Sequence, residues 1–294
     1  MIAKKITDMM MNPIRIPFEE TEKSDSNEGF GEAFSDYHNK WDRHPFEIQS
    51  DDIVINGEYI LCPEAASKPS KVVIVCHGQT VTRAGAVKYA KMFYDMGYNI
   101  VLFDERYFGK TTGTCCTLGW KEHEDITAVI RYTKTVFGED CFLGIHGESL
   151  GAGSSLLALK YETPDFMIED CPFADTGMLI GDLAHKYLRL IEKSLIKRVE
   201  KLCDKRYPGY SFKNVKPKDA VAGTNVPICF MHGAQDRLIF CKHSKIMYDS
   251  CKNPLREIHL FKDTDHARSV FNYPKEYEKI MRDFVKKVER EKGY

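Results

Sequence analysis

Residues 142–159 read FLGIHGESLGAGSSLLAL, a stretch in which an apolar run gives way to a helical pattern. A short apolar run precedes Gly147, a segment typical of a helix follows Gly151, and Ser149 lies between the two glycines. A G-x-S-x-G pattern between a strand and a helix indicates a sharp turn that exposes the serine hydroxyl as a nucleophile. The alternative is an ordinary tight turn with a solvated serine, since small residues suit any tight turn.

The sequence on either side alternates between short apolar runs and helical patterns. The apolar runs predict strands at 71–76, 99–103, 141–145, 166–169, 226–231 and 257–261. The helical patterns cover 84–96, 120–137, 150–161, 176–206, 242–251 and 275–290. Short buried strands that alternate with helices predict a parallel sheet with helices on both faces. Ligands bind such sheets at the carboxyl ends of the strands, so site residues are expected in the loops that follow them.

A serine hydroxyl needs a base to remove its proton and an acid to orient that base. His266 and Asp236 each follow a predicted strand, and the chain order Ser149, Asp236, His266 is typical of a triad in such a sheet. Asp170 and Asp263 are alternative acids, because Asp170 also lies at a strand end. We predict Ser149 as nucleophile, His266 as base and Asp236 as the orienting acid.

Other histidines compete with His266 for the role of base. His259 alternates within a strand and His243 lies early in a helix, so both are expected to pack rather than react. His146 and His232 each precede a glycine at a strand end and are expected to pack beside the site. None of these positions suits a base as well as the loop that holds His266.

The reaction also needs donors for a developing oxyanion. We predict the backbone N–H of Leu150, which directly follows the nucleophile at a helix N-terminus. The second donor is expected from the loop after the strand VVIVC, where we favour the N–H of Gln79.

Composition excludes several other functions. The 294 residues include 42 basic and 43 acidic side chains, and this near-neutral balance favours neither nucleic acid nor an anionic membrane as a partner. The ten cysteines are scattered, several lie in apolar runs and no C-x-x-C pair occurs, so we expect free thiols in a reducing compartment. We expect no metal and no cofactor. With neither a signal peptide nor a stretch as long as a membrane span, a cytoplasmic protein is expected.

The first part of the chain is the least regular. Residues 1–44 are polar but carry several aromatic side chains, so we expect a partly ordered N-terminal extension that packs on a main domain at 45–294. Residues 46–61 alternate loosely around Asn56-Gly57, which predicts a hairpin with its turn there.

Six short motifs together resemble the α/β-hydrolase superfamily. In chain order they are VCHGQT, FDERYFGKTTG, GIHGESLGAG, EDCPFADT, FMHGAQD and DTDHARS. The set is especially similar to bacterial serine hydrolases grouped with the S33 aminopeptidases and the prolyl-oligopeptidase-like esterases, from about residue 46 to the end. The resemblance implies an α/β-hydrolase fold: a mostly parallel eight-stranded sheet, helices on both faces and a small helical lid inserted at about 174–222. It also implies Ser149, Asp236 and His266 as a triad, with Gln79 and Leu150 as oxyanion donors.

These observations predict a cofactor-free serine hydrolase, most readily a carboxylesterase that cleaves small or medium acyl esters through an acyl-enzyme. Met178 and Leu179 in the lid would contact the acyl group if they face inward, or would only pack the lid on the sheet. One alternative is a serine peptidase acting on short peptides, which an exposed acid pair in the lid would favour. Another is a non-catalytic binding protein of the same fold. The sequence does not determine the oligomeric state.

Overall fold

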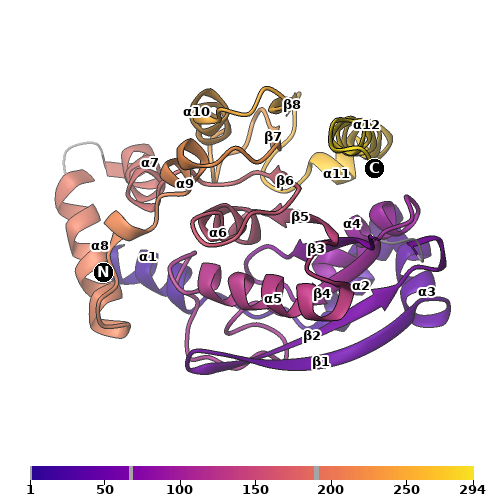
Figure 1. The fold of residues 1–294 in the computed structure, drawn as a ribbon. Helices are drawn as coiled ribbons and strands as arrows, with labels where there is room; N and C mark the ends of the chain where they lie inside the picture. The colour runs from indigo at the N-terminus through magenta and orange to yellow at the C-terminus, as the bar shows by residue number, and fades with distance from the viewer. Residues whose placement is uncertain (1, 66–68, 189–191) are drawn as a thin grey trace.

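A single eight-stranded sheet runs through the molecule in the order β1-β2-β4-β3-β5-β6-β7-β8 (Figure 1). The computed structural model describes residues 2–65, 69–188 and 192–294. The strands are β1 Asp42–Ser50, β2 Ile53–Leu61, β3 Lys71–Cys76, β4 Asn99–Phe103, β5 Phe142–Glu148, β6 Phe166–Asp170, β7 Ile228–Gly233 and β8 Glu257–Phe261. From β4 to β8 all neighbours are parallel, whereas β2 is antiparallel to both β1 and β4. The predicted mostly parallel sheet of eight strands is therefore confirmed.

The sequence of strand β3 is apolar at nearly every position because both faces of the strand are buried. Val73 and Val75 belong to the hydrophobic core on one face of the sheet, and Val72 and Ile74 belong to the core on the other. Successive side chains of a strand point to opposite faces, so a strand covered on both faces needs apolar residues throughout. The same reasoning accounts for the apolar runs that predicted the other central strands.

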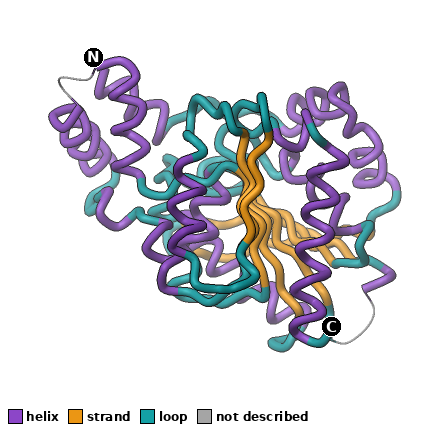
Figure 2. The backbone as a smooth tube through the Cα atoms, turned by 90° about the horizontal axis from the view of Figure 1, so that it is seen from above, coloured by secondary structure: helices purple, strands orange, loops and turns teal. Residues whose placement is uncertain are grey.

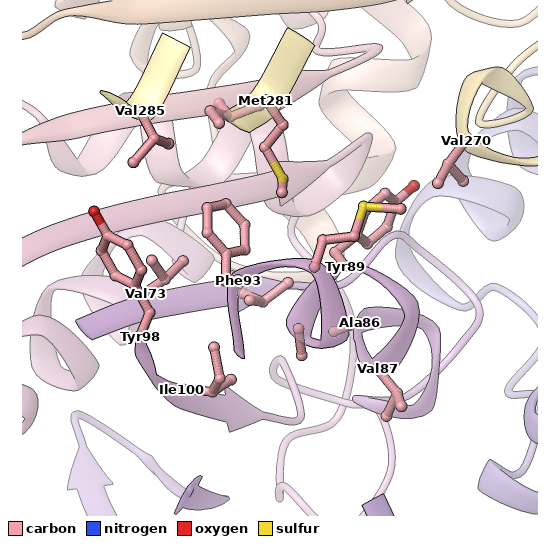
Figure 3. Close-up of a cluster of buried hydrophobic side chains, with 14 of the residues drawn as sticks. Val73, Ala86, Val87, Tyr89, Phe93, Tyr98, Ile100, Val270, Met281 and Val285 are labelled. Carbon is pink, nitrogen blue, oxygen red and sulfur yellow. The ribbon is translucent and has the colours of Figure 1, made fainter. Parts of the chain in front are cut away.

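Helices cover the two faces of the sheet as separate layers, which Figure 2 shows on either side of the twisted strands. One layer includes α4 Ala84–Tyr94, α11 Ser269–Asn272 and α12 Pro274–Lys292. The other includes α5 Glu122–Phe137, α6 Leu150–Ala158, α9 Pro217–Gly223 and α10 Lys242–Ser250. In the first layer, Phe93 of α4 and Met281 of α12 point toward one another over Val73 (Figure 3). The core therefore holds the strand ends, and the loops that follow them, in fixed positions.

The hairpin prediction was wrong in its register. Strands β1 and β2 form the hairpin, but Ser50 pairs with Ile53, so the turn is the two residues 51–52. Asn56-Gly57 lies within β2 instead. A Cβ at Gly57 would lie 2.8 Å from the carbonyl oxygen of Leu102, so glycine is needed there because two strands approach closely, not because the chain turns.

The N-terminal region is helical and packed on the rest of the chain. It comprises α1 Ile2–Met11, α2 Phe18–Asp25, a kinked turn η1 Ser26–Phe30 and α3 Gly31–Asn39. Phe34 and Tyr37 of α3 join the core with α4. Helix α1 lies beside α8, far from α3 (Figure 1). The described part of this region, residues 2–44, thus contacts two separate parts of the molecule.

The segment between β6 and β7 carries the inserted helices. Besides α9 they are α7 Thr176–Leu188, α8 Glu192–Arg206 and the short turn η4 Phe212–Asn214. Residues 189–191, within the predicted helix 176–206, lie outside the described residues. Side chains of α1, α7 and α8 form a third hydrophobic core that also contains Phe173 and Leu150. Among the helices in the described ranges, none combines the length and the apolar character needed to span a membrane.

Candidate active site

Ser149 occupies a sharp, strained turn between a strand and a helix. Strand β5 ends at Glu148 and helix α6 begins at Leu150. Ser149 has φ 53° and ψ −105°, a conformation that a residue with a side chain rarely adopts. Its N–H donates to the carbonyl oxygen of Asp170 in β6 at 2.8 Å. The turn lifts the hydroxyl above the carboxyl ends of the strands, as the sequence pattern predicted.

The two glycines of the pattern make this turn possible. A Cβ on Gly151 would lie 2.6 Å from the carbonyl oxygen of Cys76 and 2.7 Å from that of His77. A Cβ on Gly147 would lie 2.5 Å from the Cα of Ala152. Real Cβ atoms do not approach backbone this closely, so α6 packs against the sheet only because both positions lack side chains.

Three predicted side chains lie in one chain of hydrogen bonds. Ser149 Oγ lies 2.8 Å from His266 Nε2, and His266 Nδ1 lies 2.6 Å from Asp236 Oδ2. With the Nδ1 proton donated to the carboxylate, Nε2 is free to accept the serine proton. Asp236 Oδ1 accepts the N–H groups of Leu238 and Ile239, each at 2.8 Å, which fixes the carboxylate.

The charges of this chain suit proton transfer. Burial alone would raise the pKa of Asp236, but its hydrogen bonds with His232 and His266 outweigh burial and lower it. Burial alone would lower the pKa of His266, yet the hydrogen bond and negative charge of Asp236 raise it overall. The aspartate is therefore ionised at neutral pH, and its charge favours the protonated form of His266.

The alternative acids and bases make other contacts. Asp170 is buried, and both of its carboxyl oxygens lack a hydrogen-bond partner among the described residues. Burial and, to a smaller extent, the negative charge of nearby Glu148 raise the pKa of Asp170 to about 8. Asp263 accepts from Gln235. Three of the four competing histidines have partners outside this chain of hydrogen bonds: His146 with Tyr277, His243 with Asp182, and His259 with Glu257. The fourth, His232, lies beside the site, 3.1 Å from Asp236 Oδ2 and 2.7 Å from Ser244 Oγ.

The two predicted oxyanion donors line a small cavity with Ser149. Leu150 is the first residue of α6, so its N–H has no partner within the helix. The backbone N–H of Gln79 donates to no acceptor within the described ranges. The side chain of Gln79 was not part of the prediction: its Nε2 donates to the carbonyl oxygen of Met10 at 2.9 Å and so ties α1 to this loop.

The small cavity is apolar and has a volume of about 50 Å³. Besides Ser149, Gln79 and Leu150, it is lined by side chains from α1, α7 and the loop after β7, among them Met9, Leu183 and Leu238. Of the two predicted substrate residues, Leu179 lines this cavity. Met178 is half-buried and does not line it; its N–H donates to Asp175.

A second cavity, of about 350 Å³, adjoins Ser149 and His266 and is lined by charged groups. Lys88 is buried there, 3.3 Å from Asp25 and 3.6 Å from Glu148, and Arg268 pairs with Glu28. These residues were not predicted from the sequence. Glu148 could have been considered, because it lies between Gly147 and Ser149 in the G-x-S pattern. Nothing in the sequence linked Asp25 to Glu148.

Two groups of side chains place potential metal ligands within 4.8 Å of one another. One contains Asp236 and His266 with Cys171, and its acid and base already bond each other. The other contains Cys229, Glu257 and His259, and there Glu257 is paired with both His259 and Lys287. The expectation that the reaction uses neither metal nor cofactor stays a prediction.

Comparison with known proteins gives relatives of low identity and the same fold. No protein-family model matches the chain. The uncharacterized protein YqkD of Bacillus subtilis is 28% identical over 216 residues, covering 72% of this chain and 70% of YqkD. The lysophosphatidylserine lipase ABHD12 of Xenopus tropicalis is 24% identical over 253 residues, which cover 78% of this chain and 61% of that protein, so the chain matches less than two thirds of it.

Among solved structures, the esterase Pf2001 of Pyrococcus furiosus superposes with a TM-score of 0.67 at 23% identity, covering 86% of this chain and 93% of the esterase. Together with the strand order and the turn at Ser149, this likeness confirms the predicted fold. The chain has the α/β-hydrolase fold.

Proposed function

We propose that this protein is a serine hydrolase that cleaves carboxylic esters through an acyl-enzyme on Ser149. The observation that carries the proposal is the hydrogen-bonded chain from Ser149 Oγ through His266 to Asp236, at 2.8 and 2.6 Å. The strained turn and two backbone N–H groups beside the hydroxyl supply the other parts that acyl transfer needs.

The geometry supports a two-step reaction. His266 Nε2 takes the proton of Ser149 as Oγ attacks the acyl carbonyl, and the N–H groups of Gln79 and Leu150 stabilise the oxyanion. Collapse of the tetrahedral intermediate breaks the bond to the alcohol, which leaves with the proton from His266. A water molecule then gives its proton to His266 and attacks the acyl-enzyme, releasing the acid and restoring Ser149.

The charges around the site favour an ester over a short peptide. A peptidase that anchors a free amino terminus needs an acid without a cation beside it. In the charged cavity, Asp25 and Glu148 both lie beside Lys88, and Glu28 is paired with Arg268. In the insertion proposed as a lid, 174–222, Asp175 pairs with Lys218 and Asp182 with Lys242. Each of these acids already has a cation beside it, with Lys88 shared by Asp25 and Glu148, which argues against their binding an ammonium group.

Hydrolysis of p-nitrophenyl butyrate tests the proposal. We expect wild type to turn over, and Ser149→Ala to lose roughly 10⁴- to 10⁶-fold in kcat, because the covalent step cannot occur without Oγ. Ser154→Ala is the matched control, since Ser154 is buried in α6 and its hydroxyl has no partner within the described ranges. It should keep wild-type activity.

Three outcomes would contradict the proposal. Equal rates for wild type and Ser149→Ala would mean that another group carries the reaction. A wild type that is inert toward esters but cleaves peptide p-nitroanilides would favour the peptidase, and one inert toward both would favour a binding protein of this fold.

The expected cytoplasmic location stays part of the proposal. All ten cysteines lie in the described part of the chain and are free, and nine of them are buried. Free thiols are typical of a reducing compartment, which supports this location.

A further inference from the structure

A groove much larger than the cavity at Ser149 extends outward from His266. Its volume is about 890 Å³, within the range of about 300–1,000 Å³ that small-molecule sites occupy. One wall is α1, through Ile2, Ile6 and Met9, and the facing wall carries Leu183 and Leu238. The surface of the groove is therefore mostly apolar, with Lys5, Arg237, Asp265 and Arg268 also lining it, and α1 supplies four of the ten lining residues.

The groove is continuous with the cavity at the nucleophile. Met9, Leu183 and Leu238 line both the groove and the small cavity that contains Ser149. A chain of methylene groups attached to an acyl carbonyl at Ser149 would leave the small cavity between these three side chains. It would then lie along the apolar face of α1.

The groove leaves large apolar side chains exposed to water. Ile2 and Met9 are each 47% exposed and Leu238 is 42% exposed, and all three belong to its lining. A cluster of exposed apolar side chains beside a reactive group is typical of a binding site, because a ligand that covers it gains the free energy of burying that surface.

The helix that forms this wall is fixed in place. Met10 and Met11 are buried in the core that α1 shares with α7 and α8. Gln79 Nε2 donates to the carbonyl oxygen of Met10, and the N–H of Cys116 donates to that of Met11 at 2.9 Å. The wall is thus formed before any ligand arrives, which lowers the entropic cost of binding.

We propose that this groove is the acyl-chain subsite, that α1 is a wall of the substrate site, and that the substrates are esters of long, unbranched aliphatic acids. This inference rests on the proposed ester hydrolysis and extends the small or medium acyl esters expected from sequence. The cavity at Ser149 alone holds only a short chain, whereas the groove has room for many further methylene groups.

A series of p-nitrophenyl esters from two to sixteen acyl carbons, kept below their micelle-forming concentrations, tests the subsite. Each methylene that enters the groove should raise kcat/KM about three- to fourfold, because its burial contributes about 0.8 kcal/mol. The rise should continue beyond the short acyl chains that the small cavity can hold and should level off where the groove ends.

Met9→Trp should block the passage between cavity and groove. The ratio of kcat/KM on esters of twelve or more carbons to kcat/KM on the acetyl ester should fall at least about tenfold, since several buried methylenes are displaced. Leu238→Trp, on the opposite wall, should lower kcat/KM on the long-chain esters relative to the acetyl ester in the same way. Ile14→Trp is the matched control, because Ile14 is 73% exposed, follows α1 and lines neither the small cavity nor the groove. The dependence of kcat/KM on acyl length in this variant should match that of wild type.

The outcomes separate this inference from the proposed function. No hydrolysis of any ester, the acetyl ester included, would overturn both. Hydrolysis without dependence on acyl length, or an unchanged length profile in both tryptophan variants, would overturn the subsite alone. A length dependence seen only with alkyl acetates would place the chain on the alcohol side and contradict the acyl assignment. A dimer that Met9→Trp dissociates without changing the profile would make the groove an interface between copies.

Discussion

Two buried aspartates, Asp170 and Asp236, follow neighbouring strands beside the candidate nucleophile, and their hydrogen bonds distinguish them. Asp236 accepts from His266, His232 and two backbone N–H groups. Asp170 has no such partner among the described residues, and burial raises its pKa to about 8. At neutral pH we therefore expect Asp236 to be charged and Asp170 to be largely protonated.

This difference predicts opposite results for two similar substitutions. Asp236→Asn should lower kcat roughly 10⁴-fold, since an amide neither fixes the correct tautomer of His266 nor stabilises its charged form. Asp170→Asn should stay close to wild type, because an amide resembles a protonated carboxyl. Steady-state kinetics on p-nitrophenyl butyrate measures both; a larger loss in Asp170→Asn would assign the orienting acid to Asp170 instead.

The same pair predicts how activity depends on pH. The base must be neutral, so kcat/KM should rise with pH as His266 loses its proton, with a midpoint above the ordinary 6.5 because Asp236 raises the pKa of His266. In Asp236→Asn that midpoint should fall, since the charge that favours the imidazolium is gone and burial then lowers the pKa. Equal midpoints in the two proteins would contradict the assigned pair.

At the scale of elements, the turn between β5 and α6 depends on backbone contact. Gly151 lies against the carbonyl groups that end β3, so α6 cannot hold its place if that residue gains a side chain. This contact connects the fold to the site, since the same helix start orients Leu150 and Ser149. Residues of the turn therefore affect stability and activity together.

Gly151→Ala should destabilise the protein by about 1–3 kcal/mol and lower its esterase activity, because helix and strand must move apart. Gly223→Ala is the control. A Cβ at Gly223, near the end of α9, meets nothing within 4 Å, so this variant should be unchanged or more stable by about 0.4–1 kcal/mol. Urea unfolding measures both; equal stability of the two variants would contradict the close packing at Gly151.

Most of the elements could be predicted from sequence, and the reason is physical. Strands buried on both faces need unbroken apolar runs, so β3 and β4 were predicted with the bounds that the structure has. The turn of the hairpin of β1 and β2 was predicted at the wrong residues, because Asn56-Gly57 is a strong turn signal when it is considered without its surroundings. Its glycine serves the close approach of β2 to β4, a contact between segments that are distant in sequence.

At the scale of the whole molecule, parallel topology made the site predictable. The carboxyl ends of adjacent parallel strands share one edge, so Ser149, Asp236 and His266 meet although the chain separates them. The N-terminal residues were not predictable in this way. Helix α1 has no strand to fix its position, and only its contacts with Gln79 and with α8 show that it lies beside the nucleophile.

The central claim is that Ser149 is a nucleophile activated by His266. Its most direct test is a fluorophosphonate probe added to folded wild type, followed by mass spectrometry of the digested protein. If His266 activates Ser149, we expect one adduct, on the peptide that contains Ser149. Ser149→Ala should give no adduct, and His266→Ala should react much more slowly. No adduct in wild type, or labelling of another residue with Ser149 unmodified, would contradict it.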